Sequence, residues 1–260
     1  MPKRLFEENF NDGIQDNKKK SSRIKKIPDK LLIIVLENAS LEIIKVGNKY
    51  ELLNIEKHKQ ILNKKIYTDL SNLRPDIVHQ CLLMLMDSPL NLSGHLKVYI
   101  HTQKNVLIEI NPRTRIPRTI ERFSGLMVQL LQNLSIQSVQ SEEKLLKIIK
   151  NPVSNHIPIG FMKFGTSVLS SISMKPFELI TLINDKTENP DKIINESMMI
   201  DKISNKTNSE GYVFVVGAMA HGSVNTDYTE KDISLSEYPL SAALTCSKLC
   251  NIFEQAWNIF

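Results

Sequence analysis

Residues 212–222 read Tyr-Val-Phe-Val-Val-Gly-Ala-Met-Ala-His-Gly, an apolar run that leads directly into a segment bounded by two glycines. The first five residues are continuously apolar, which is typical of a short strand buried on both faces of a sheet. Gly217 and Gly222 let the backbone approach a ligand closely where such a strand ends. The third glycine of a dinucleotide-binding loop is missing, so the pattern alone gives only weak support for a cofactor site.

The rest of the chain supplies further strands and helices around this segment. Residues 31–36, Leu-Leu-Ile-Ile-Val-Leu, predict another buried strand, and the alternating residues 96–110 predict a hairpin. Residues 37–67 mix charged and apolar side chains, which indicates partly helical structure. Apolar spacing and capping residues predict helices over 74–87, from Pro117 to about Asn133, from Ser141 to just before Pro152, and over 241–257. Buried strands that alternate with helices favour an α/β domain with a mainly parallel sheet.

The composition excludes several classes of protein. The 260 residues are 42% hydrophobic and 23% charged, which indicates a globular chain of one large domain or two small ones. No apolar run reaches about 18 residues, so we expect no membrane-spanning helix and no membrane partner. The first residues lack the apolar core of a signal peptide, so we expect no secretion.

The cysteines and histidines do not predict a disulfide framework or a metal site. Three cysteines are an odd number, which favours a reducing compartment. Cys246 and Cys250 lie one helical turn apart on the predicted last helix, so we expect them to pack in the core rather than to bind zinc. The six histidines show no metal-ligand spacing. We therefore expect no metal.

Positive charge is concentrated in two places. The net charge is +5, yet residues 1–30 alone hold nine Lys or Arg against five Asp or Glu. We interpret residues 1–29 as a disordered basic tail, either a nuclear address or RNA-binding arm or simply a solvated terminus, and residues 30–260 as the folded domain. Residues 184–211 are polar throughout, which predicts an inserted surface loop with a short helix near 193–199.

The second concentration, residues 111–122, holds four arginines and one glutamate. Arginine presents a rigid fork that suits phosphates and base edges. A helix that begins near Pro117 would align Arg118 with Arg122, and Arg115 would lie just before them. We favour an RNA-contacting ridge over a solvated basic face paired with acids.

Two other short patterns give weaker indications. Asp76 is close enough in sequence to hold the guanidinium of Arg74, although a plain helix cap is favoured on spacing alone. Gly160 and Gly165 resemble a phosphate-binding loop, but Thr166 stands where that motif needs lysine. A nucleoside triphosphatase is therefore rejected.

Several long motifs together resemble one family. They are Arg74-Pro-Asp-Ile-Val-His-Gln-Cys-Leu-Leu, Arg115-Ile-Pro-Arg-Thr-Ile-Glu-Arg-Phe-Ser-Gly-Leu, Ser141-Glu-Glu-Lys-Leu-Leu-Lys, Val216-Gly-Ala-Met-Ala-His-Gly and Tyr238-Pro-Leu-Ser-Ala-Ala. In this order they resemble the eukaryotic and archaeal small-subunit ribosomal RNA pseudouridine N1-methyltransferases of the SPOUT superfamily. The resemblance runs from about residue 30 to the C-terminus and is interrupted by the 184–211 insertion.

The resemblance implies an α/β SPOUT fold with a C-terminal trefoil knot, a homodimer, and S-adenosyl-L-methionine as methyl donor. It implies that three loops hold this cofactor. The carried-over cofactor residues are Thr166, Gly217, Gly222, Leu235, Ser236, Glu237, Tyr238, Pro239 and Leu240. Glu237 stands where relatives commonly have Asn, which we expect to matter little because that loop binds largely through its backbone.

The resemblance also implies the substrate and the residues that contact it. The family's RNA-binding arginines match Arg74, Arg115, Arg118 and Arg122, and Asp76 matches the acid that orients Arg74. Arg113 falls outside the matched set and is held as an accessory contact. The expected activity is methylation of nitrogen 1 of a pseudouridine in small-subunit rRNA, in the nucleolus, beside other assembly factors. The alternative is an rRNA-binding assembly factor whose essential role needs no methyl transfer, and no catalytic residue is assigned.

Overall fold

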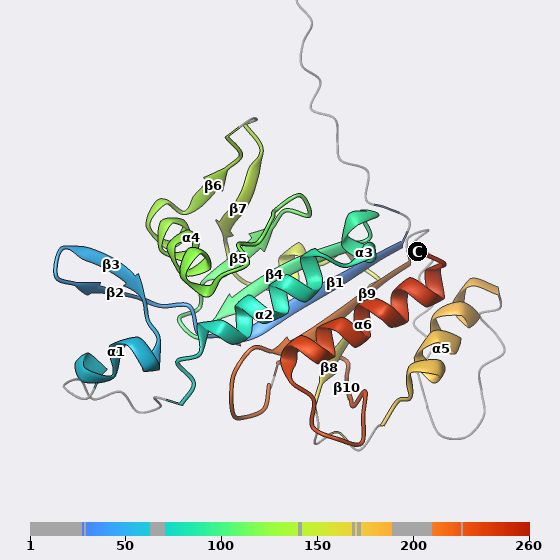
Figure 1. Ribbon diagram of the computed structural model, residues 1–260. Helices are drawn as coiled ribbons and strands as arrows, with labels where there is room; N and C mark the ends of the chain where they lie inside the picture. The colour runs from blue at the N-terminus through green and yellow to red at the C-terminus, as the bar shows by residue number, and fades with distance from the viewer. Residues whose placement is uncertain are drawn as a thin grey trace, which may run out of the picture.

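The computed structural model describes residues 28, 30–62, 71–139, 142–167, 170, 173–188, 210–224 and 226–260. An eight-stranded sheet in the order β10-β8-β9-β1-β4-β5-β7-β6 runs through the molecule (Figure 1). Its parallel strands are β1 (Lys30–Ala39), β4 (Leu96–Thr102), β8 (Met162–Thr166), β9 (Glu210–Gly217) and β10 (Lys231–Ile233). Beyond β4 the pairing is antiparallel, through β5 (Leu107–Ile110), β7 (Lys144–Ile149) and β6 (Ser135–Gln137). The predicted α/β architecture is confirmed, with a mixed and mostly parallel sheet.

The two apolar runs singled out in the sequence lie side by side at the centre of this sheet. Strand β1 pairs in parallel with β9, and Ile33 stands opposite Val213. Alternate residues of each run enter different cores: Leu32 packs on the helical side, whereas Ile33 packs on the opposite side. Burial on both faces explains why these strands are apolar throughout rather than alternating.

Helices cover the face of the sheet on which Leu32 packs. Helices α2 (Pro75–Met86), α6 (Ala242–Trp257) and α5 (Pro176–Glu188) lie beside one another across it, and the short α3 (Pro89–Leu92) follows α2 (Figure 1). The predicted last helix is confirmed: Ser241 caps α6 by accepting from the backbone N–H of Leu244. Cys246 and Cys250 are buried in the same core as Cys81, as expected of packing residues. The opposite face is covered by the segment around the 3-10 turn η1 (Val153–His156).

Residues 37–67 are less helical than their composition indicated. Strand β1 continues to Ala39, and an antiparallel pair of strands follows, β2 (Ile43–Val46) and β3 (Lys49–Leu52). Helix α1 (Ile55–Leu62) comes next, and residues 63–67 lie outside the described part of the chain. The prediction of partly helical structure therefore holds only for α1.

The helix predicted to begin at Ser141 is wrong. Residues 144–149 form strand β7, which pairs with β5 on one side and β6 on the other. Only Leu146 of this strand is fully buried, so its apolar spacing fits a helix as well as a strand. Pairing with β5 and β6 then makes the segment a strand, because tertiary context commonly determines the structure of short segments. Ser141 itself lies outside the described residues.

The helix predicted from Pro117 begins later, as α4 (Ile120–Asn133). Thr119 is extended, with φ −100° and ψ 141°, and its carbonyl accepts the first helical hydrogen bond from Phe123. The Pro117 carbonyl lies 2.7 Å from Nε2 of His79 on α2, which holds this segment outside the helix. Leu134 closes α4 in a left-handed conformation and is exposed, so the buried face of the helix ends at Leu130.

The tail and most of the polar insertion fall outside the described residues. These are residues 1–27 and 29, and residues 189–209, which include the short helix predicted near 193–199. Helix α5 runs through Glu188 and β9 begins at Glu210, so the two ends of the predicted 184–211 insertion belong to regular elements. Among the described helices, none has the length and apolar character that crossing a membrane requires.

Candidate functional site: a cavity at the ends of three parallel strands

Strands β8, β9 and β10 end at the same edge of the sheet, and the loops that follow them enclose a cavity. Its volume is about 510 Å³, within the range of small-molecule sites. The cavity is lined by residues at the ends of the three strands and in the loops after them, and by Ser241, Ala242, Ala243 and Thr245 at the start of α6. Ligands of open α/β sheets bind at this carboxyl edge, where the loops converge.

Seven of the nine predicted cofactor residues line this single cavity. They are Thr166, Gly217, Gly222, Leu235, Ser236, Tyr238 and Leu240. Glu237 instead lines a neighbouring hollow of about 240 Å³ beside Lys175 and Pro176, and Pro239 lines neither. The backbone thus brings three loops together as expected, while the Glu237 side chain belongs to the adjacent surface.

The two glycines of the opening motif are required by the shape of the loop after β9. A Cβ on Gly217 would lie 2.8 Å from Cγ2 of Val224, closer than atoms pack without a shift. Gly222 has φ +107°, a backbone conformation that side-chain-bearing residues rarely adopt. The wall of the cavity here is therefore bare main chain.

Short hydrogen bonds fix the other two loops. The Thr166 hydroxyl donates to the Val215 carbonyl at 2.9 Å, which ties the end of β8 to β9. In the third loop, the Ser234 hydroxyl donates to the Ser236 carbonyl at 2.6 Å. The backbone N–H of Tyr238 donates to the Ser236 hydroxyl at 3.1 Å. These serines shape the loop locally.

Arg74 links this cavity to the arginine motifs of the sequence. It precedes α2, lines the cavity, and donates two hydrogen bonds to Asp76, from Nε to Oδ1 at 2.8 Å and from Nη2 to Oδ2 at 2.6 Å. This bidentate contact lowers the pKa of Asp76 and raises that of Arg74. The predicted contact between the two residues is present, and it fixes the plane of the guanidinium.

The other arginines do not form the predicted ridge along one helix. Arg118 precedes α4 and forms an ion pair with Asp87, the residue that ends α2, whereas Arg122 lies within α4. Arg113 is paired with Glu143 at 3.1 Å. Arg115 and Arg122 are exposed, and within the described ranges no acid makes an ion pair with either. The extended Thr119 separates Arg118 from α4, so the predicted alignment of Arg118 with Arg122 on one helix is wrong.

Helix α2 sets the spacing of this basic surface. Arg74 lies at its start and the Arg118–Asp87 pair at its end, and 12 helical residues span about 18 Å. The contact from His79 to the Pro117 carbonyl holds the arginine-bearing segment along the same helix. A basic surface of this length suits a nucleic-acid strand better than a single small anion.

Comparison with known proteins identifies the family. Residues 34–254 match the family model described as EMG1/NEP1 methyltransferase. The chain belongs to the EMG1/NEP1 family. It is 54% identical to the ribosomal RNA small subunit methyltransferase NEP1 of Homo sapiens over 90% of this chain and 85% of that protein. It is 46% identical to the Drosophila melanogaster protein of the same name, over 89% of this chain and 84% of that protein.

A solved structure shows the same fold in an archaeal relative. The crystal structure of Archaeoglobus fulgidus Nep1 bound to S-adenosylhomocysteine matches with a TM-score of 0.65. The match covers 87% of this chain and 98% of that one, at 24% sequence identity. The EMG1/NEP1 fold is thus retained where most of the side chains differ.

One residue of this EMG1/NEP1 chain at the site was not predicted. The Oδ1 atom of Asn72 accepts hydrogen bonds from the backbone N–H groups of Ala220 and His221, each at 3.1 Å. Asn72 lies two residues before Arg74, so it joins the arginine segment to the cavity loop. No spacing rule marks a lone asparagine before a helix, and only the fold brings it to residues nearly 150 positions away.

Metal ligation is not indicated within the described ranges of this family member. No group of three or more His, Cys, Asp or Glu side chains gathers there as ligands would. The three cysteines are buried, and burial raises the pKa of the Cys250 thiol to about 12. They contribute to the core between α2 and α6.

Proposed function

We propose that this chain methylates nitrogen 1 of a pseudouridine in small-subunit rRNA, with S-adenosyl-L-methionine as donor, during small ribosomal subunit biogenesis. The observation that carries the proposal is that one cavity joins the three strand-end loops to Arg74. A site for a small donor molecule and a side chain suited to RNA phosphate therefore share one opening. The names of the relatives and the S-adenosylhomocysteine in the archaeal structure support the same function.

The residues of the cavity fit this cofactor. S-adenosyl-L-methionine, when bound, supplies an electrophilic methyl group. Of the described residues, none that line the cavity is Asp or Glu, so the carboxyl group of the cofactor would meet no acidic side chain. Thr166, Gly217, Gly222 and the loop 235–240 would hold it, with the bare backbone at Gly217 and Gly222 allowing close approach.

The arginines would hold and orient the RNA. Arg74 is pre-oriented by Asp76, whereas Arg115 and Arg122 are exposed for phosphates. The side chains of Arg118 and Asp87 are 71% and 54% exposed, so their ion pair is worth at most about 1 kcal/mol. A phosphate can therefore replace Asp87 at little cost, and all four predicted arginines remain available.

The chemistry of the target base explains why pseudouridine is the substrate. Pseudouridine carries a free N–H at position 1, which uridine lacks, and this proton must leave near the transfer step. Flipping the base out of its loop brings the nitrogen to the cavity opening. Arg74 at that opening would stabilise negative charge that develops on the base. We assign no general base.

We also propose the finer features of this fold and its assembly. The C-terminal part of the chain forms a trefoil knot, as the resemblance of its motifs to the SPOUT methyltransferases implies. A second copy of the chain covers the apolar side chains exposed near the cavity, Phe177, Tyr238 and Leu244. The chain acts in the nucleolus with other assembly factors, and residues 1–29 serve as its basic tail.

Calorimetry with S-adenosylhomocysteine separates this function from that of an rRNA-binding assembly factor without methyl transfer. We expect one saturable site per chain on the purified full-length protein. RNA binding with no detectable cofactor binding would contradict the enzyme and favour the assembly factor.

A further inference from the structure

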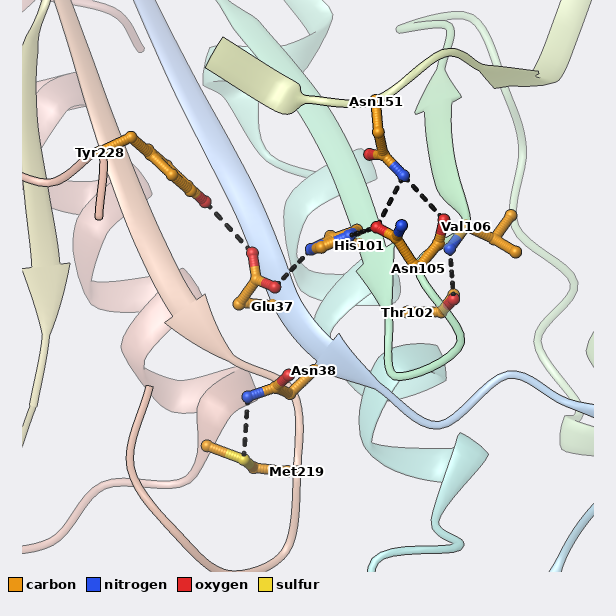
Figure 2. Close-up of polar contacts among 9 residues, drawn as sticks. All are labelled: Glu37, Asn38, His101, Thr102, Asn105, Val106, Asn151, Met219 and Tyr228. Atoms are coloured by element: carbon orange, nitrogen blue, oxygen red, sulfur yellow. Dashed lines mark hydrogen bonds and ion pairs between the residues drawn. The ribbon is translucent and has the colours of Figure 1, made fainter. Parts of the chain in front are cut away.

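A buried carboxylate lies behind the cavity, at the end of the central strand. Glu37 of β1 is only 6% exposed and stands opposite Gly217 of β9. Its Oε1 lies 2.5 Å from Nδ1 of His101 on β4, and its Oε2 accepts the hydroxyl of Tyr228 at 3.1 Å (Figure 2). Both carboxylate oxygens are therefore occupied by side chains from elements distant in sequence.

The main-chain carbonyl of Asn105 fixes which hydrogens this network carries. A carbonyl only accepts, so the atom of Asn151 that lies 2.7 Å from it must be the amide nitrogen Nδ2. The same Nδ2 lies 2.8 Å from the side chain of Asn105, which must then present its oxygen Oδ1. That oxygen lies 2.9 Å from Nε2 of His101, so Nε2 carries a hydrogen (Figure 2).

His101 is therefore doubly protonated in this arrangement. Its Nε2 faces an amide oxygen and its Nδ1 faces a carboxylate, and neither of these partners donates. With Glu37 ionised, both ring nitrogens donate, and the ring is an imidazolium paired with the carboxylate of Glu37. The hydrogen bond that His101 donates to Glu37 accordingly raises the pKa of His101.

Glu37 also touches both ends of the loop between β9 and β10, residues 218–230. Its main-chain carbonyl accepts the N–H of Ala218 at 2.7 Å, where the loop begins. Its side chain accepts the Tyr228 hydroxyl near the end of the same loop. The neighbouring Asn38 places its Nδ2 3.8 Å from Sδ of Met219, which lines the cavity (Figure 2).

We propose that Glu37 is a positioning residue of the cofactor cavity and that the imidazolium of His101 fixes its carboxylate. The ion pair holds Tyr228, and through it the far end of the loop whose near end carries Met219 and Gly222. The proposal rests on the proposed function, because it assigns the role of Glu37 to the cavity that takes the methyl donor. It adds a residue on the far side of the sheet, which contacts no substrate.

The sign of the pH dependence follows from the groups around His101. These are Glu37 on β1, Asn105 and Asn151, which are neutral, and Tyr228, whose pKa is raised by burial and by Glu37. Lys104 of the same turn is paired with Glu42 at 3.7 Å. A raised pKa means that the ion pair is complete at low pH and is lost as pH rises through that pKa. Cofactor affinity should fall as the ion pair is lost.

The protonation of His101 can be measured without any cofactor. We expect the ring ¹⁵N resonances at pH 7 to show both nitrogens protonated, with His101→Asn used to assign them. Glu37→Gln should move the titration of this ring to lower pH. A neutral ring at pH 7 would overturn the ion pair.

Calorimetry with S-adenosylhomocysteine between pH 6 and 9 tests the positioning role. We expect the wild-type Kd to rise with pH, and Glu37→Gln to raise Kd roughly tenfold at pH 6 while removing the pH dependence. Glu109→Gln is the matched control, since Glu109 is a half-buried carboxylate on β5 that pairs with Lys97 and Lys147 instead of the loop. That variant should bind as the wild type does.

The outcomes separate this proposal from the one on which it rests. A wild-type chain that binds no S-adenosylhomocysteine at any pH overturns the proposed function and the positioning role together. Equal affinity and an equal pH profile in Glu37→Gln and the wild type overturn the positioning role alone. If Glu37→Gln does not fold, Tyr228→Phe removes only the hydroxyl, and an unchanged Kd in that variant is equally decisive.

Discussion

At the scale of single residues, two aspartates hold two arginines in different ways. Asp76 orients Arg74 through two hydrogen bonds at the opening of the cavity. Asp87 instead pairs with Arg118 on the open surface, where both side chains are well exposed. In the proposed function, the first contact would preorganise an arginine for RNA, whereas the second would compete with RNA for one. Replacing Asp76 should therefore weaken RNA binding, whereas replacing Asp87 should not.

We expect Asp76→Asn to weaken binding of an rRNA hairpin about three- to tenfold, because Arg74 loses its charged, bidentate partner. Asp87→Asn, its matched control at the other end of α2, should leave affinity unchanged or raise it slightly. Fluorescence anisotropy at one fixed salt concentration measures both. Equal losses in the two variants would mean that Asp76 has no orienting role.

At the scale of elements, the loops at the ends of β8, β9 and β10 carry the site, and a glycine sets the shape of one of them. Gly222 has φ +107° in the cavity wall, and Gly94 has φ +84° between α3 and β4, where it lines no part of the cavity. Alanine at either position forces an unfavourable backbone conformation, at a cost of about 1–3 kcal/mol. The two positions differ only in what lies beside them.

Both variants should therefore lower the melting temperature by a similar amount. Gly222→Ala should also weaken S-adenosylhomocysteine binding at least tenfold, whereas Gly94→Ala should bind S-adenosylhomocysteine normally. Calorimetry and thermal unfolding on both variants measure the difference. Unchanged affinity in Gly222→Ala would contradict the assignment of this loop to the cofactor.

Some of these elements could be predicted from the sequence, and others could not. The central strands and helices α2 and α6 were predictable, because continuous apolar runs and helical spacing leave few alternatives. Strand β7 was not, since its Lys-Leu-Leu-Lys pattern fits either structure until β5 and β6 pair with it. At the site, the motifs predicted the three loops and Arg74. Asn72 and Glu37 act through contacts across the fold, which no local pattern encodes.

At the scale of the whole molecule, the net charge of +5 understates how basic the surface of the four predicted RNA-binding arginines is. The four predicted arginines are spread along α2 and the start of α4, with Arg74 and Arg118 at opposite ends of α2. Each phosphate contact releases counterions, so RNA affinity should fall steeply with salt. The number of contacts then appears as the slope of that dependence.

Four contacts predict a slope of roughly −3 for the logarithm of affinity against the logarithm of salt, at about 0.7 per contact on single strands. Arg122→Gln should reduce the magnitude of the slope by about 0.7. Lys150→Gln removes an equal charge from the end of β7 and should leave the slope unchanged. An unchanged slope in Arg122→Gln would remove this arginine from the RNA surface.

The central claim is that the cavity beside Arg74 transfers a methyl group to nitrogen 1 of pseudouridine in small-subunit rRNA. The most direct test is incorporation of a labelled methyl group into a short rRNA hairpin that carries one pseudouridine, against the same hairpin with uridine. We predict stoichiometric labelling of the pseudouridine hairpin, recovered as N1-methylpseudouridine, and none of the uridine hairpin. Equal labelling of both hairpins, or labelling of neither by a chain that binds the cofactor, would contradict the account.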